Sequence, residues 1–403
     1  MWRPYRFELV QDMVTSQGTW SLRRGWLLRL QTPEGSVGWG EAALPPMAIP
    51  PTGSSPARRT DGRRASRRAD QVMGRNQAPA EATSRAVQRA QAALNALPAV
   101  LERQALETLL PDLPAPLACA LGMALAELDG LGSAGAGGWL TAPPSARLLP
   151  AGEAAIEALE EEVRRLTPDP PSPADSAADR GLSVDAADRP DPGAALLEPG
   201  ESTQEARNTG PSAGYGSASA FTVKWKVASG DDGLERRVLE TLLERLPHNG
   251  RLRLDANGGW DRATAWRWAE RLAGEPRLDW LEQPLPPDDQ AGLEELARLV
   301  PVALDESLRL NPQPVAGGWD GWQVRRPLAE ADPRPLLAAL QAGRPRLMLS
   351  TAFETGIGRR FLQHLAGLQA LGPTPTAPGL APGWRPRGDL FAQEPETAWE
   401  GAG

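Results

Sequence analysis

Three acidic residues, each directly after a short apolar run, are candidates for a metal-binding site. They are Asp255 in RLRLDANGGW, Glu282 in LDWLEQPL and Asp305 in VALDESL. They lie 27 and 23 residues apart. Because one strand, loop and helix take about that length, successive units of a parallel barrel would bring the three side chains together. Three carboxylates converging at strand ends predict a site for a divalent metal ion.

An all-oxygen, negatively charged site favours a hard cation. Mg²⁺ is the expected cofactor, with Mn²⁺ as a substitute, because Mg²⁺ takes few carboxylates and leaves positions for water or substrate. Each acid also has an ordinary structural explanation: Asp255 as a turn cap through Asn257, Glu282 as a surface residue, and Asp305 as a helix cap. Their recurrence on successive units, at the end where such barrels keep their sites, favours metal binding.

Two lysines precede the acids in FTVKWKVA. Lys224 and Lys226 are two residues apart, so they share one face of a predicted strand. Val223, Trp225 and Val227 alternate with them, and a closed parallel barrel covers both strand faces, so the lysines should point inward. Their mutual repulsion and a nearby metal predict that the pKa of a lysine falls towards neutrality, as a general base requires. Salt-bridged structural lysines are the alternative.

Composition limits the function classes. The chain has 403 residues and a net charge of −8, which argues against a nucleic-acid binder and favours a small-molecule substrate. Two histidines leave little material for zinc hydrolase motifs or a histidine-centred triad. The single cysteine, Cys119, fits a reducing cytoplasm, and no apolar run is long enough to cross a membrane. The sequence does not predict an oligomeric state.

The order of predicted elements indicates two architectures. Strands followed by helices predict an α+β capping domain over residues 1–135. Alternating short apolar runs and helical stretches predict a (β/α) barrel over 145–370, with 371–403 completing the cap. Residues 51–79 and 167–219 are rich in Pro, Ala, Arg, Asp, Gly or Ser and are predicted to be disordered insertions.

Several motifs together resemble the enolase superfamily, in its muconate-lactonising subgroup. They are the lysine pair, the DAN, LEQP and LDES segments, and GWGEA at 38–42. The resemblance covers nearly the whole chain apart from the two insertions. It implies a modified TIM (β/α) barrel with an N-terminal α+β capping domain.

GWQVRRP (321–327) and LSTAFETGIGRR (349–360) are similar to one branch of that subgroup. This implies a lyase that dehydrates 2-succinyl-6-hydroxy-2,4-cyclohexadiene-1-carboxylate to 2-succinylbenzoate in menaquinone or phylloquinone biosynthesis. The resemblance gives Lys226 the role of base and Lys224 an electrostatic role, with Mg²⁺ on the three acids. It also implies substrate contacts from Ser350, Thr351, Asn257 and Gly356.

One residue departs from the subgroup's pattern. Many relatives carry a second lysine before a proline on the sixth strand, where this chain has Arg326. Arginine is a poor base, which argues against two-base racemases and epimerases. Arg326 either stabilises the developing negative charge or only pairs with a barrel acid. Dipeptide epimerase, N-acylamino-acid racemase, muconate cycloisomerase and a non-catalytic metal-binding barrel remain the alternatives.

Overall fold

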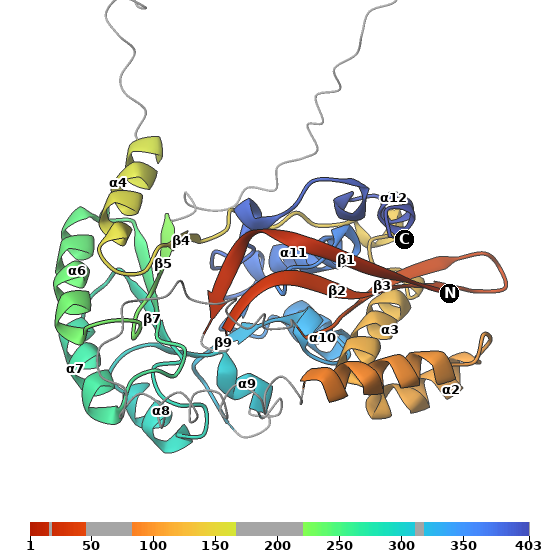
Figure 1. Ribbon diagram of the computed structural model, residues 1–403, viewed down its shortest axis with the longest axis horizontal. Coiled ribbons are helices and arrows are strands. Elements are labelled where there is room, and N and C mark those ends of the chain that lie inside the picture. The colour runs from red at the N-terminus through yellow and green to blue at the C-terminus, as the bar shows by residue number, and fades with distance from the viewer. Residues whose placement is uncertain (16–17, 46–82, 167–220, 311–317, 403) are drawn as a thin grey trace, which may run out of the picture.

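The computed structural model describes residues 1–15, 18–45, 83–166, 221–310 and 318–402. The predicted insertions at 51–79 and 167–219 lie outside the described residues. Figure 1 shows an antiparallel sheet with orange helices on one side and a curved parallel sheet with outer helices on the other. No helix within the described ranges is long and apolar enough to cross a membrane.

The N-terminal part is a small α+β unit. Its three antiparallel strands pair in chain order, and residues 83–96 form a helix beside them. A Cβ on Gly40 would come within 1.8 Å of the Ala120 carbonyl oxygen, so glycine is what allows the third strand to lie against the long helix. The elements are β1 (Trp2–Thr15), β2 (Gly18–Gln31), β3 (Val37–Ala43), α2 (Arg103–Leu109) and α3 (Ala115–Leu128).

The second part is a parallel sheet whose seven strands pair in sequence order, as in a TIM barrel. A short segment of the C-terminal tail lies between its first and last strands: Gly379 bonds both Leu349 and Thr351, and Pro378 accepts from Ala146. The strands are β4 (Arg147–Leu149), β5 (Thr222–Lys226), β6 (Arg251–Asp255), β7 (Leu278–Glu282), β8 (Val302–Leu304), β9 (Trp322–Arg325) and β10 (Leu347–Leu349).

Helices cover the outside of this sheet. The side chains of Asp231, Asp261 and Asp289 accept N–H bonds from the first turns of three of them, so the sequence itself sets where these helices begin. The helices are α4 (Ala154–Leu166), α6 (Asp232–Arg245), α7 (Arg262–Leu272), α8 (Gln290–Leu296), α9 (Glu306–Leu310), α10 (Arg334–Gln341), α11 (Gly356–Ala370) and, in the tail, α12 (Pro395–Glu400).

The predicted modified barrel with an N-terminal α+β cap is therefore confirmed. Inside the barrel Arg253 stacks over Trp280 and forms a buried layer below the site, next to Ala303, Val324 and Met348. One inward position further along the strands come the residues predicted to do chemistry. The layer beneath gives them a rigid floor.

Candidate active site

The two lysines enter the barrel from β5. Val223, Trp225 and Val227 are buried in the cluster between the strands and the outer helices, which leaves Lys224 and Lys226 on the inner face. The inward orientation predicted for the lysines is thus what the structure has. Apolar alternation alone was enough to specify it.

Strand register brings the acids beside the lysines. Lys226 pairs with Asp255 across β5 and β6, and Asp255 pairs with Glu282 across β6 and β7. Asp305 directly follows β8, and all three carboxylates are almost fully buried. The strands therefore place Asp255 beside Glu282, and Asp305 at the end of the next strand.

Gln283, which the sequence did not single out as functional, links two of these units. Its side-chain oxygen accepts the backbone N–H groups of Asp305 and Ser307, and its amide donates to the Ser307 hydroxyl at 2.8 Å. The side chain is fully buried. Gln283 therefore fixes the start of α9, and with it the direction of Asp305. The glutamine directly after Glu282 in LEQP was the available signal.

Lys224 lies between two of the acids. Its Nζ is 2.9 Å from Asp255 Oδ2 and 2.7 Å from Glu282 Oε1. Burial disfavours its charge, but the two carboxylates outweigh burial and raise the pKa of Lys224. Its contacts are those of a fixed ammonium, which suits an electrostatic role.

Lys226 is held more loosely. Its Nζ donates to Asn257 Oδ1 at 2.9 Å and lies 3.7 Å from Asp255 Oδ2. About 29% of its side chain remains exposed, against 17% for Lys224, so of the two amines it is the more accessible from the barrel mouth. A base needs such access to a substrate proton.

Asp305 and Arg326 form a two-point ion pair. Arg326 Nη2 and Nε donate to the two carboxylate oxygens at 2.8 and 3.2 Å, and Arg309 adds a third contact at 3.0 Å. Burial alone would raise the pKa of Asp305, but the two arginines hold it well below its usual range. The pairing of Arg326 with a barrel acid, one of its two predicted roles, is observed.

The same arginine contacts the predicted substrate segment. Arg326 Nη1 donates to the Ser350 hydroxyl and to the Thr351 carbonyl, each at 2.8 Å. Gly356 has a packing role, since a Cβ there would meet the Ala392 carbonyl at 1.8 Å. Asn257 lies in the site, bonded to Lys226. Substrate contacts from these four residues stay predictions.

The donor set has the chemistry that Mg²⁺ prefers, because it consists of buried carboxylates. Glu282 Oε2 is buried and has no hydrogen-bond partner among the described residues, which is the kind of oxygen that a cation satisfies. Among the described residues, however, no three acids are grouped as a closed metal site. Lys224 separates Asp255 from Glu282, and Arg326 occupies both oxygens of Asp305. Metal binding requires these two cations to move aside.

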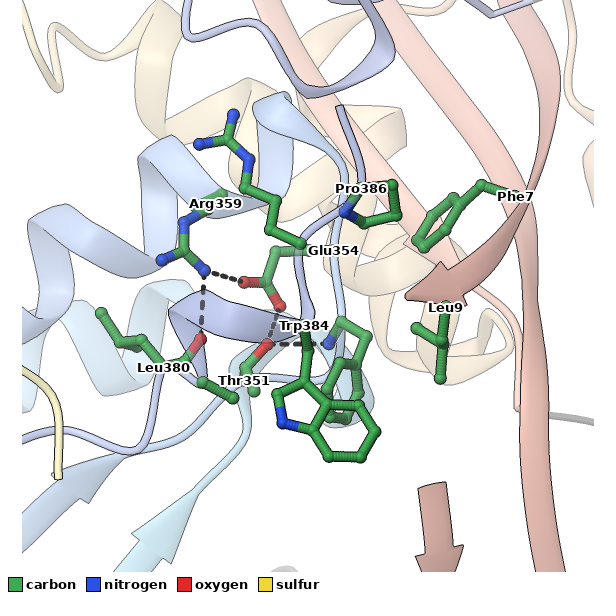
Figure 2. A pocket seen from close by; sticks show the side chains of 11 residues that line it. Phe7, Leu9, Thr351, Glu354, Arg359, Leu380, Trp384 and Pro386 are labelled. Atoms are coloured by element: carbon green, nitrogen blue, oxygen red, sulfur yellow. Dashed lines mark hydrogen bonds and ion pairs between the residues drawn. The ribbon is translucent and has the colours of Figure 1, made fainter. Parts of the chain in front are cut away.

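A small pocket lies where the cap, the barrel and the tail meet (Figure 2). In Figure 2, Phe7 and Leu9 of β1 lie on the right and Trp384 of the tail in the middle, with Thr351 and Glu354 on the left. Its cavity of about 10 Å³ holds about one water molecule, so it cannot receive a substrate without movement.

Glu41, which the sequence supplied only as part of GWGEA, joins the cap to the barrel. Its buried carboxylate accepts from the Tyr5 hydroxyl at 2.7 Å, the Thr355 hydroxyl at 2.6 Å and the backbone N–H groups of Thr355 and Gly358. A cap residue thereby satisfies the first N–H groups of α11. The segment holding Ser350 and Thr351 leads into that helix.

Comparison with known proteins indicates the structural class of this chain. Residues 212–311 match the family described as "Enolase C-terminal domain-like". The fold is that of the enolase superfamily, and the resemblance predicted from the motifs is confirmed. A dipeptide epimerase structure from Bacillus subtilis, with a TM-score of 0.55 and 16% identity over 96% of this chain and 90% of its own, shares the fold.

Within that class the chain is similar to o-succinylbenzoate synthases. The curated enzyme of Thermosynechococcus vestitus is 41% identical over 153 residues, which is 36% of this chain and 48% of the relative. The structure from Thermosynechococcus elongatus, described as complexed with Mg in the active site, has a TM-score of 0.62 and 26% identity over 99% of this chain and 98% of its own. The sequence matches span about half the length of the first curated relatives.

Proposed function

We propose that this protein is an o-succinylbenzoate synthase, a Mg²⁺-dependent lyase. It would remove water from 2-succinyl-6-hydroxy-2,4-cyclohexadiene-1-carboxylate to give 2-succinylbenzoate. The observation that carries the proposal is the position of Lys226, an accessible amine beside Asp255 at the mouth of a barrel with three buried acids. The similarity to synthases of this name supports the substrate.

Each residue has a task in the proposed reaction. The Lys226 amine removes the proton alpha to the ring carboxylate, and the electron pair moves into the ring as the bond to the 6-hydroxyl breaks. The resulting Lys226 ammonium returns a proton to the departing hydroxide, so water leaves from the same face. The ring becomes aromatic, and no other reactant is consumed. Lys224, moved aside from Asp255 and Glu282 when the metal binds, contributes a positive charge near the substrate carboxylate.

Asp255, Glu282 and Asp305 would hold the metal. Bound Mg²⁺ supplies positive charge that lowers the energy of the carboxylate-stabilised carbanion. The buried, unpartnered Glu282 Oε2 supports this assignment from the chain's own geometry. The metal-bound relative supports it by analogy.

A dipeptide epimerase is a second candidate. A hydrophobic dipeptide epimerase of a Flavobacteria bacterium is 44% identical over 63 residues, which is 15% of this chain and 18% of the relative. Epimerisation by two bases needs a second amine, but Arg326 stands where relatives carry it and is tied to Asp305, Ser350 and Thr351. The arginine therefore favours the one-base dehydration.

The test is a spectroscopic assay of 2-succinylbenzoate formation with Mg²⁺ present, run beside assays of dipeptide epimerisation, N-acylamino-acid racemisation and muconate cycloisomerisation. We expect metal-dependent dehydration to be the fastest reaction. Faster turnover of one of the other substrates would replace the proposal, and no turnover of any would favour the non-catalytic barrel. A role in menaquinone or phylloquinone synthesis and a cytoplasmic location, which the single buried Cys119 supports, belong to the same proposal.

A further inference from the structure

Glu306 is an acid with about 14% of its side chain exposed, and the proposed reaction gives it no task. It follows Asp305 and begins α9. Its Oε1 accepts from Asn257 Nδ2 at 3.1 Å, and its Oε2 is buried without a hydrogen-bond partner among the described residues. The nearest guanidinium nitrogen of Arg309 is 3.8 Å away, beyond hydrogen-bond distance. The defined partner of this carboxyl group is therefore Asn257.

Asn257 links Glu306 to the predicted base. One end of its amide accepts from Lys226 Nζ at 2.9 Å, and the other donates to Glu306. Lys226 Nζ meets the amide oxygen and Glu306 Oε1 meets the amide nitrogen, so both contacts go with the same orientation of the amide. A flipped amide would give up both contacts as they stand. Glu306 thus selects which amide atom faces Lys226.

The backbone of Asn257 is fixed independently. Its φ is +46°, a left-handed conformation that asparagine tolerates better than most residues, and its N–H donates to Asp255 Oδ1 at 3.1 Å. With the backbone held, rotation of the side-chain amide is the freedom that remains. The contact with Glu306 removes that freedom.

We propose that Glu306 is a positioning residue that acts through Asn257 to hold the amine of Lys226 at the place from which it removes the substrate proton. The role rests on the proposed function of Lys226 as base. Without Glu306 the amide turns, the 2.9 Å contact is lost, and the amine moves towards Asp255.

The kinetic test compares Glu306→Gln with Glu306→Ala. The glutamine keeps an oxygen that accepts from Asn257, so most of kcat should remain. Alanine should lower kcat about 10- to 100-fold with little change in KM, as loss of an orienting partner does. If glutamine is as damaging as alanine and Mg²⁺ binding by calorimetry also weakens, Glu306 is a metal ligand and the proposal is overturned.

A double-mutant cycle tests the link itself. Asn257→Ala should lower kcat as much as Glu306→Ala, and the double variant should lose nothing further, because both changes break one chain of contacts. Additive losses would overturn the proposal. Glu294→Ala on α8 is the control and should leave kcat unchanged. If Glu306→Ala does not fold, Glu306→Leu replaces it in the cycle.

A readout that does not need turnover separates this inference from the proposed function. Crystal structures of the wild type and of the Glu306→Ala or Glu306→Leu variant should differ in the contact between Lys226 Nζ and Asn257 Oδ1, which the variant loses. Persistence of that contact would overturn the positioning role. A wild-type protein that holds the contact but does not dehydrate the substrate would refute the proposed function instead.

Discussion

Two groups of buried carboxylates in this protein have opposite surroundings. Glu41, at the junction of cap and barrel, is satisfied by neutral hydroxyl and backbone donors. At the mouth, Asp255, Glu282 and Asp305 contact lysine and arginine, and one Glu282 oxygen has no partner. A carboxylate whose oxygens are all bonded by neutral donors is a fixed structural contact. A carboxylate that contacts cations, or has an oxygen without a partner, can exchange partners.

Removal of the predicted base should have the largest effect. Lys226→Ala should lower kcat by about 10²- to 10⁴-fold, the usual contribution of a positioned base, while thermal unfolding barely changes. Lys226→Arg is the matched control, because it keeps a positive charge near Asp255 but is a poor base. Turnover of substrate by Lys226→Arg at the wild-type rate would show that the reaction needs only a positive charge at position 226, not a base.

Removal of the metal tests whether the mouth carboxylates exchange partners. EDTA should abolish activity, and added Mg²⁺ should restore it. Glu282→Gln should weaken Mg²⁺ binding by at least about tenfold, because a neutral amide is a poorer ligand for a hard cation. Calorimetric titration measures the affinity. Equal Mg²⁺ affinity in the wild type and the variant would remove Glu282 from the proposed metal site.

Glu41 should behave in the opposite way. Glu41→Gln points an NH₂ group at donors that need an acceptor, so we expect a loss of about 2 to 4 kcal/mol of unfolding free energy. The kcat of the folded fraction should change by less than about tenfold, since Glu41 contacts no predicted catalytic group. Urea unfolding and kinetics measure the two effects. A large kcat loss with unchanged stability would contradict the distinction between Glu41, as a structural contact between cap and barrel, and the acids at the barrel mouth.

The smallest expected effect is a change in how stability depends on pH, caused by Glu127. Burial raises the pKa of Glu127 on α3 to about 7, against the pull of Arg360. The folded state therefore holds a proton that the unfolded chain releases near the usual pKa of 4.5, and the stability from this group is lost as pH rises from about 5 to about 7. The shift corresponds to at most roughly 3 kcal/mol.

Glu127→Gln should flatten this pH dependence. Melting temperatures of the wild type and the variant, measured from pH 5 to about 8, should converge or cross as the pH rises. Parallel curves would mean that Glu127 titrates normally, and that its ion pair with Arg360 outweighs burial.

The inward orientation of the lysines and the position of the acids at strand ends were predictable from local patterns. The alternation of apolar residues with Lys224 and Lys226 has the period of a strand, and each acid ends or directly follows a strand. The N-caps Asp231 and Asp261 also act within four residues. Because these relationships are short in sequence or strictly periodic, the fold class could be predicted without coordinates; the roles of the site residues stay predictions.

The hydrogen-bond and ion-pair partners of these side chains were not predictable from the sequence. Glu41 bonds Thr355, which is 314 residues away, and Asn257 bonds Glu306 across 49 residues. The pKa of Lys224 is raised because the carboxylates of Asp255 and Glu282 are its neighbours. Which residues point into the barrel follows from the sequence, since period and spacing are local properties. Which charged groups pair with each other follows from the folded structure, because those contacts depend on where distant strands and loops lie.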